Sequence, residues 1–215
     1  MNWYKNNKRS FSWRNTNDPW KILLIEIISQ QTQINRANTY YQKFVKKFPT
    51  PESMSKSSLK TILKMWSGLG YNNRAKRLYE SSKLLAEQGF EGIYPNFEIL
   101  PGVGPYTKNA ILSFAYGDNV LAVDTNLQRI IIRYFGIDNT KDYLREYSDL
   151  LLESIKSEDL NQAFMDFGSS ICTSSNTKCD ICPLEKSCKK YFINSKNSIK
   201  KFKGSNRELR GKIIK

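Results

Sequence analysis

The 215-residue sequence contains no histidine. This excludes Ser-His-Asp and Cys-His catalysis, zinc sites with imidazole ligands, and acid–base chemistry by imidazole. Proton transfer must therefore use carboxylates, tyrosine, lysine or water. Apolar runs long enough to cross a bilayer are also missing, as is a recognisable targeting segment. We expect a cytoplasmic location with no membrane partner, where thiols stay reduced.

Acidic side chains are scarce relative to basic ones. The 34 lysines and arginines face 20 aspartates and glutamates, which gives a net charge of +14. Residues 189–215 alone carry ten basic residues and one acid, a net charge of +9. This segment is either a solvated tail or a contact with a polyanion such as a nucleic acid, whose phosphates dominate binding affinity. A membrane surface is disfavoured, because no amphipathic helix with a clear apolar face accompanies the charge.

Helical patterns cover most of the chain, and the alternating apolar patterns typical of strands are missing. With 40% hydrophobic and 25% charged residues, the chain is expected to be globular. Pro49 follows one apolar segment, and Gly117 and Gly136 follow two others, as expected at helix ends. The sequence therefore predicts an all-α fold, with helices over residues 20–34, 37–48, 57–66, 72–88, 105–116, 125–134, 143–155 and 160–167, and a short one from residue 51.

All four cysteines lie in one short stretch near the end of the sequence, at Cys172, Cys179, Cys182 and Cys188. Their spacing, C-x6-C-x2-C-x5-C, lets four soft ligands surround one metal centre, because thiolates select iron–sulfur clusters or zinc. Disulfides are disfavoured, because they belong mainly to secreted proteins. Zinc sites usually use two C-x2-C pairs, and only one such pair is present. The spacing favours a [4Fe–4S] cluster, with zinc as the alternative.

Two glycines, Gly102 and Gly104, lie in the turn Leu100–Gly104 between two predicted helices. Glycine lets the backbone turn tightly and approach a partner closely. The next helix begins at Pro105, and its free N–H groups and positive dipole end suit a phosphate. Such turns also serve as plain connectors between helices. The turn by itself therefore supports either a phosphate-binding site or a simple connection.

Two carboxylates are candidate catalytic groups. Glu26 lies in the apolar segment Ile22–Ile28, on a helical face that it shares with the polar residues that follow. It is either an exposed acid or an acid at the floor of an apolar cleft, where burial would raise its pKa and let it donate a proton near neutral pH. Asp124 precedes the helix predicted over residues 125–134 and suits an N-cap, which also holds a carboxylate in place.

Five motifs occur in order along the chain: Glu26 with the run Ser29-Gln30-Gln31-Thr32-Gln33, then Trp66-Ser67-Gly68-Leu69-Gly70-Tyr71, then Leu100-Pro101-Gly102-Val103-Gly104-Pro105-Tyr106-Thr107, then Val123-Asp124-Thr125-Asn126, and finally the four-cysteine loop. In this combination the sequence resembles the helix-hairpin-helix DNA glycosylases of the endonuclease III superfamily, over about residues 11–192. Within that superfamily, the Gln-Gln-Thr run and the Asp-x-Asn motif resemble those of the MutY-type adenine glycosylases.

The resemblance implies a role for each matching residue. Glu26 matches the acid that protonates the adenine ring. Asp124, oriented by Asn126, matches the carboxylate that stabilises the positively charged sugar. Tyr106 stands where bifunctional relatives have a Schiff-base lysine, which implies base release without strand cleavage. The residues implied to contact the DNA or the flipped base are Arg14, Gln30, Gln31, Tyr71, Gly102, Gly104 and Gln162. Two of these, Gln31 and Tyr71, would insert into the base stack.

The resemblance also implies an architecture. One helical lobe, residues 21–133, would carry the helix-hairpin-helix motif. A second lobe, residues 1–20 plus 134–215, would hold a structural [4Fe–4S] cluster and the basic tail, with a DNA cleft between the lobes. The implied protein is a nucleoid-associated monomer that binds double-stranded DNA with a mismatched or damaged base pair. Because the sequence ends at Lys215, we expect a short form without the C-terminal Nudix-like domain of two-domain relatives.

The implied function is base-excision repair by a monofunctional glycosylase that removes adenine opposite 8-oxoguanine or guanine. A thymine or uracil glycosylase acting on T:G or U:G mismatches is an alternative, because Tyr106 and the Asp-x-Asn motif fit it equally well. A non-catalytic DNA-binding metalloprotein is an alternative of another class. The Gln30-Gln31-Thr32 run favours adenine.

Overall fold

The structure, a computed structural model, describes residues 1–137, 140–153 and 155–192. Over these residues the chain is helical without any β-strand, which confirms the all-α prediction. The α-helices are α1 (Asn2–Asn7), α2 (Pro19–Ser29), α3 (Ile34–Lys47), α4 (Pro51–Ser55), α5 (Leu59–Trp66), α6 (Asn73–Ile93), α7 (Pro105–Ile111), α8 (Thr125–Phe135), α9 (Thr140–Leu152) and α10 (Ser157–Ser170). The basic segment from residue 193 onward lies outside the described residues.

Two expectations about helices were wrong in detail, and one helix was not expected. The helix expected over residues 20–34 ends at Ser29, and a turn separates it from α3. The helix expected over residues 72–88 continues to Ile93 past a kink at Gly89, where φ is 68°. The sequence did not predict α1, because one turn and a half is too short to show a period. Among the described residues, no helix is long and apolar enough to span a membrane.

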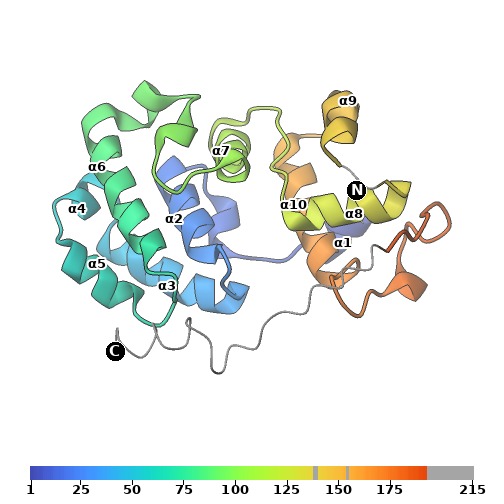
Figure 1. Cartoon of the computed structure of the whole chain (residues 1–215), viewed down its shortest axis with the longest axis horizontal. Helices are drawn as coiled ribbons and strands as arrows, with labels where there is room; N and C mark the ends of the chain where they lie inside the picture. Colours follow the sequence, from blue (N-terminus) through green and yellow to red (C-terminus); the bar gives the residue numbers. More distant parts are fainter. Residues whose placement is uncertain (138–139, 154, 193–215) are drawn as a thin grey trace.

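The largest hydrophobic core is built around α2. Asp18 caps this helix by accepting a hydrogen bond from the backbone N–H of Trp20 at 3.0 Å, and Pro19 occupies its first position. Nearly all of its apolar side chains are buried, as a helix that is hydrophobic on most sides requires. Figure 1 shows α4 to α6 to the left of α2, α3 below it and α7 to its right. The core thus extends from Trp20 to Leu112 along the sequence.

Two smaller hydrophobic clusters lie at the other end of the molecule, where Figure 1 shows α1, α8, α9 and α10 together. One contains Leu121, Leu127, Ile131, Leu152 and Leu160. The other contains Ile130, Phe167 and Ile171, with Trp3 and two cysteines packed against it. Side chains of α8 therefore pack with those of α10. The division into lobes 21–133 and 1–20 plus 134–215 stays a prediction.

A buried polar network joins the large core to the smaller ones. Ser113, in the π-helical turn that continues α7 to Tyr116, contacts the hydroxyl of Ser157 at 2.9 Å. Asn161 donates to the Ser113 hydroxyl at 3.1 Å and accepts from the backbone N–H of Ala122 at 2.9 Å. Because these buried groups satisfy one another, the segment that leads into α8 is held in one position relative to α7 and α10.

Candidate functional site

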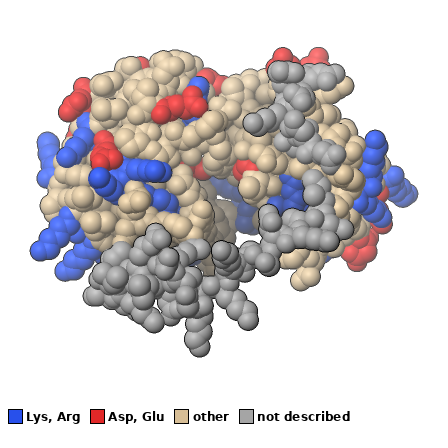
Figure 2. All heavy atoms as spheres, viewed as in Figure 1, with Lys and Arg blue, Asp and Glu red and all other residues tan. Residues whose placement is uncertain are grey.

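A cavity of about 290 Å³ is lined by residues of the N-terminal segment, α2, α7, α8 and α10. Six residues singled out in the sequence meet there: Arg14, Glu26, Tyr106, Asp124, Asn126 and Gln162. Much of the remaining wall is apolar or aromatic, with Phe11, Trp13, Ile25 and Phe114 among its side chains. In Figure 2 the molecule is hollowed near the middle of this face, with both basic and acidic side chains inside the hollow. A large apolar pocket with a few convergent polar groups is where a ligand is expected.

Glu26 lies on α2 with its neighbours Ile25 and Ile27 buried in the core. Its side chain lines the cavity, so that it is only partly exposed. Burial raises the pKa of Glu26 from 4.5 to about 7; a hydrogen bond from Tyr106 lowers it, and the charge of Asp124 raises it. Near neutral pH a large fraction of Glu26 is therefore protonated, as a general acid requires.

Tyr106 lies at the start of α7, immediately after the hairpin turn. Burial raises the pKa of Tyr106 well above its usual value, and the charges of Glu26 and Asp124 raise it further. The hydroxyl therefore stays protonated and acts as a hydrogen-bond donor to Glu26. No lysine occupies this position, so the residue cannot form a Schiff base.

Asp124 is the N-cap of α8, as the sequence predicted. Its Oδ1 accepts a hydrogen bond from the backbone N–H of Leu127 at 2.7 Å, and its Oδ2 accepts one from Asn126 Nδ2 at 2.6 Å. Arg129, which the sequence did not single out, donates to Asn126 Oδ1 at 2.7 Å and to the carbonyl of Cys172 at 2.8 Å. A continuous chain of hydrogen bonds therefore connects the Asp124 carboxylate to the cysteine loop.

Arg14 is held by a carboxylate that the sequence did not reveal. Asp166 on α10 is 1% exposed and accepts hydrogen bonds from Arg14 at 2.7 Å through both of its oxygens. Arg9 donates to the same carboxylate through Nε at 2.6 Å. Burial alone would raise the pKa of Asp166, but the hydrogen bonds from Arg14 and Arg9 outweigh it and lower that pKa. Asp166 is therefore ionised and fixes the Arg14 side chain at the cavity wall.

Gln162 is the sixth of these residues, and it lies on α10 within the cavity wall. Its side-chain oxygen accepts a hydrogen bond from the hydroxyl of Tyr4, at 2.9 Å. Because Tyr4 is buried on α1, the N-terminal helix helps to fix the Gln162 amide.

The hairpin forms a separate, open groove lined by Gln30, Arg77 and residues 102–107. Gly102 has a φ of 90°, and a Cβ at this position would lie 3.2 Å from the Cβ of Arg77. Both the left-handed backbone and the close approach therefore require glycine here. Tyr106 lines this groove as well as the cavity, so a ligand in the groove would lie next to the cavity.

Gln31 and Tyr71 lie in neither cavity nor groove. Gln31 is exposed, and 43% of Tyr71 is accessible to solvent. Both adopt a left-handed backbone, with φ of 53° and 49°. This conformation is uncommon outside glycine.

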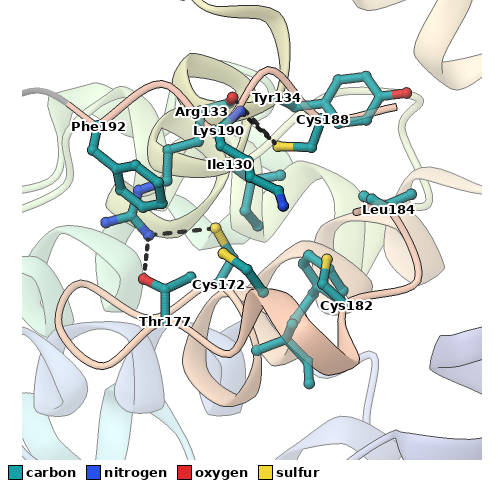
Figure 3. Close-up of a pocket in the computed structure, with 13 residues that line it drawn as sticks. Ile130, Arg133, Tyr134, Cys172, Thr177, Cys182, Leu184, Cys188, Lys190 and Phe192 are labelled. Carbon is teal, nitrogen blue, oxygen red and sulfur yellow. Dashed lines mark hydrogen bonds between the residues drawn. The ribbon is translucent and has the colours of Figure 1, made fainter. Parts of the chain in front are cut away.

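The four cysteines line one pocket, shown in Figure 3, and none forms a disulfide. Arg133 donates to the Sγ of Cys172 at 3.5 Å, and the backbone N–H of Lys190 donates to the Sγ of Cys188 at 3.3 Å. Such donors stabilise the negative charge of metal-bound thiolates. Within the part of the chain that the structure describes, no three potential ligands are close enough together to hold a single ion. The thiols surround a shared space instead.

Comparison with known proteins identifies the family. The sequence pattern of the HhH-GPD superfamily of base excision DNA repair proteins matches residues 24–154. The chain belongs to this superfamily. The match begins within α2 and ends after α9 (Thr140–Leu152), and thus includes Glu26, the hairpin and Asp124. The family expected from the ordered motifs is therefore confirmed.

Members of the superfamily and related structures resemble this chain over most of its length. The adenine DNA glycosylase of Buchnera aphidicola subsp. Baizongia pistaciae is 41% identical over 90% of this chain and 58% of its own length. The adenine DNA glycosylase of Mycobacterium tuberculosis (strain H37Rv) is 33% identical over 85% of this chain and 64% of its own length. A thermostable thymine-DNA glycosylase superposes with a TM-score of 0.79 and 32% identity, over 88% of this chain and 92% of its own.

A non-covalent endonuclease III–DNA complex shares the superfamily fold, with a TM-score of 0.71 and 22% identity over 88% of this chain and 90% of that one. The chain spans about three-fifths of the length of the curated relatives it matches first.

Proposed function

We propose that this chain is a monofunctional DNA glycosylase of base-excision repair that removes adenine paired with 8-oxoguanine or guanine. One observation carries the proposal: Glu26, with a pKa of about 7, lines the same cavity as the Asp124 carboxylate. A protonated acid and an ionised one on either side of a scissile bond are what hydrolysis of a glycosidic bond requires. Curated relatives from bacteria and mouse that are named adenine DNA glycosylases support adenine as the base.

The chemistry follows from the two carboxyl groups. An adenine turned out of the duplex enters the cavity, and Glu26 donates its proton to a ring nitrogen of the base. The bond between C1′ and the base nitrogen then breaks, with its electron pair moving onto the protonated adenine. Asp124, held by Leu127 and Asn126, stabilises the positive charge left on the sugar. Water adds its oxygen to C1′ and gives its proton to a carboxylate, which leaves abasic DNA.

The remaining predicted residues would bind the DNA. Gly102 and Gly104 would hold a backbone phosphate in the hairpin groove, with Gln30 at its edge. Gln31 and Tyr71 would insert into the base stack, and Arg14 and Gln162 would contact the flipped adenine. In this proposal a nucleoid-associated monomer binds the duplex between the lobe of residues 21–133 and the lobe of residues 1–20 and 134–215.

The cysteine pocket fits a [4Fe–4S] cluster held by Cys172, Cys179, Cys182 and Cys188. The fit rests on four reduced thiols around one pocket and on the N–H donors to two of them. When bound, the cluster would cross-link the loop through iron–thiolate bonds. Visible absorbance together with iron and inorganic sulfide in the purified protein tests this assignment. A colourless protein that contains zinc would contradict it.

The function is tested by incubating the protein with duplexes that contain A:8-oxoG, A:G, T:G or U:G. Base release is read from strand breakage after alkali, which cleaves at abasic sites. We expect product from the two adenine duplexes, and no breakage before alkali. Glu26→Gln serves as the inactive control. Binding without release from any duplex would favour a non-catalytic DNA-binding protein.

A second candidate is a glycosylase for T:G or U:G mismatches. It is favoured by the similarity to the thermostable thymine-DNA glycosylase, which matches this chain over nearly its full length. Release from T:G or U:G with none from A:G would establish this function in place of the first.

A further inference from the structure

Gln31 and Tyr71 come from segments that are far apart in the sequence, and yet both share an uncommon backbone conformation. Each has a positive φ, and Gly68 and Gly70 beside Tyr71 have φ of 96° and 73°. A left-handed residue other than glycine costs free energy, so its surroundings must hold it in place. A common support for both segments is therefore expected.

That support is the side chain of Arg74, in the first turn of α6. The residue is 7% exposed. Its Nη1 donates hydrogen bonds to the carbonyls of Ile27 at 3.2 Å and Ile28 at 3.0 Å, and also to the carbonyl of Gln30. It also reaches the hydroxyl of Thr32 at 3.2 Å. Carbonyls at the end of α2 have no partner within their own helix, and the negative end of the helix dipole favours a cation there.

The other nitrogen of the same guanidinium binds the second segment. Arg74 Nη2 donates to the carbonyls of Leu69 at 3.2 Å and Gly70 at 3.1 Å. The guanidinium lies 5.1 Å from the ring centroid of Trp66 and 5.7 Å from that of Tyr71. The guanidinium group of Arg74 therefore binds the backbone of both segments, and it also contacts the Tyr71 ring.

Arg74 is unusual in how its charge is balanced. Among the described residues no carboxylate forms an ion pair with it, so carbonyl oxygens and aromatic faces surround the buried cation. A lysine could not make these contacts together, because its ammonium is a compact point charge, whereas guanidinium donates in a fixed fork. Position 74 therefore requires the shape of a guanidinium group and not only its positive charge.

We propose that Arg74 is a positioning residue that couples the Gln31 segment and the Tyr71 segment into a single rigid wedge. The proposal rests on the proposed function, in which these two side chains enter the base stack. With both segments fixed before binding, the wedge loses little conformational freedom when it opens the duplex. Without Arg74, the segments move independently and the duplex opens less often.

The experiment compares Arg74→Gln and Arg74→Lys with Lys76→Gln as a matched control. Lys76 lies on the same helix, and its side chain is 60% exposed. Single-turnover excision is measured at saturating enzyme on an A:G duplex and on the same duplex with the target adenine opposite an abasic site. In the second substrate the adenine is already unpaired, so the excision rate depends less on a wedge that opens the base pair. Amide hydrogen exchange is followed in residues 28–33 and 69–73 without DNA.

We expect Arg74→Gln to slow excision from the A:G duplex by ~10²-fold, the size of effect that a displaced positioning group has. Excision opposite the abasic site should fall by much less. Arg74→Lys should also be slow, and Lys76→Gln should match wild type. Exchange should rise in both segments together in the two Arg74 variants.

Two results would overturn the coupling. One is an equal loss on both DNA substrates, which is the signature of general damage to the fold. The other is faster exchange in one segment while the other stays protected. If wild type releases no base from any duplex, the proposed function fails, but the exchange measurement still decides whether Arg74 joins the segments. If Arg74→Gln does not fold, Arg74→Lys carries the same comparison.

Discussion

Replacing Glu26 with glutamine should remove excision and at the same time change how stability depends on pH. The glutamine keeps the shape of a protonated glutamic acid and can still accept the hydrogen bond from Tyr106. It cannot donate an acidic proton. Loss of a general acid typically slows a reaction ~10²–10⁴-fold. DNA binding should stay within a few-fold of wild type.

The size of the stability effect follows from the pKa. Burial raises the pKa of Glu26 from 4.5 to about 7. A raised pKa means that the folded state holds the proton more tightly than the unfolded state. The stabilising contribution is complete below pH 4.5 and is lost as pH rises to about 7. The loss is about 3 kcal/mol, and most of it falls between pH 5 and pH 8.

Glutamine does not titrate, so Glu26→Gln should be more stable than wild type at pH 8 and nearly equal at pH 5. Urea unfolding at both pH values measures the difference, because urea does not screen charges as guanidinium does. Glu87→Gln is the control, since it makes the same change at an exposed position on α6. This control shows whether the pH-dependent difference belongs to the position of Glu26.

Two outcomes would refute the reasoning. If the stability difference between Glu26→Gln and wild type does not change with pH, Glu26 is not a buried, protonated acid. If Glu26→Gln excises adenine within a few-fold of wild type, Glu26 is not the proton donor. Wild-type excision should also decline above about pH 7, as the donor loses its proton.

Three further changes test the rest of the site. Tyr106→Lys should create strand-cleaving activity through a Schiff base, which borohydride traps as a covalent DNA adduct that wild type does not form. Arg129→Met should slow single-turnover excision ~10-fold or more at unchanged DNA affinity, because Asn126 loses the contact that orients it. Asp166→Asn should destabilise the fold by about 3–5 kcal/mol at neutral pH, because it breaks a buried ion pair. Since pairing lowers the pKa of Asp166, this difference should persist at pH values above 3.8 and shrink as pH falls below it, which urea unfolding measures.

The amino-acid sequence by itself determined the fold class and the family. Helical periods, capping residues such as Asp124 and the ordered motifs are local features, and each acts within a few residues along the chain. The cysteine spacing is local as well, and the thiolate-bound metal centre that it predicts stays a prediction. The sequence did not predict the turn after Ser29, because Arg74 from another helix binds the carbonyl of Gln30 and the hydroxyl of Thr32 there.

The tertiary structure alone decided how the carboxylates behave. The sequence left Glu26 as either an exposed or a buried acid, and its surroundings depend on Tyr106 and Asp124, which arrive from other helices. Asp166 and Arg129 went unnoticed for a related reason. Asp166 lies 152 residues from Arg14, and Arg129 lies 43 residues from Cys172. Charge–charge interactions and desolvation depend on distance in space, so only the folded chain reveals which groups they join.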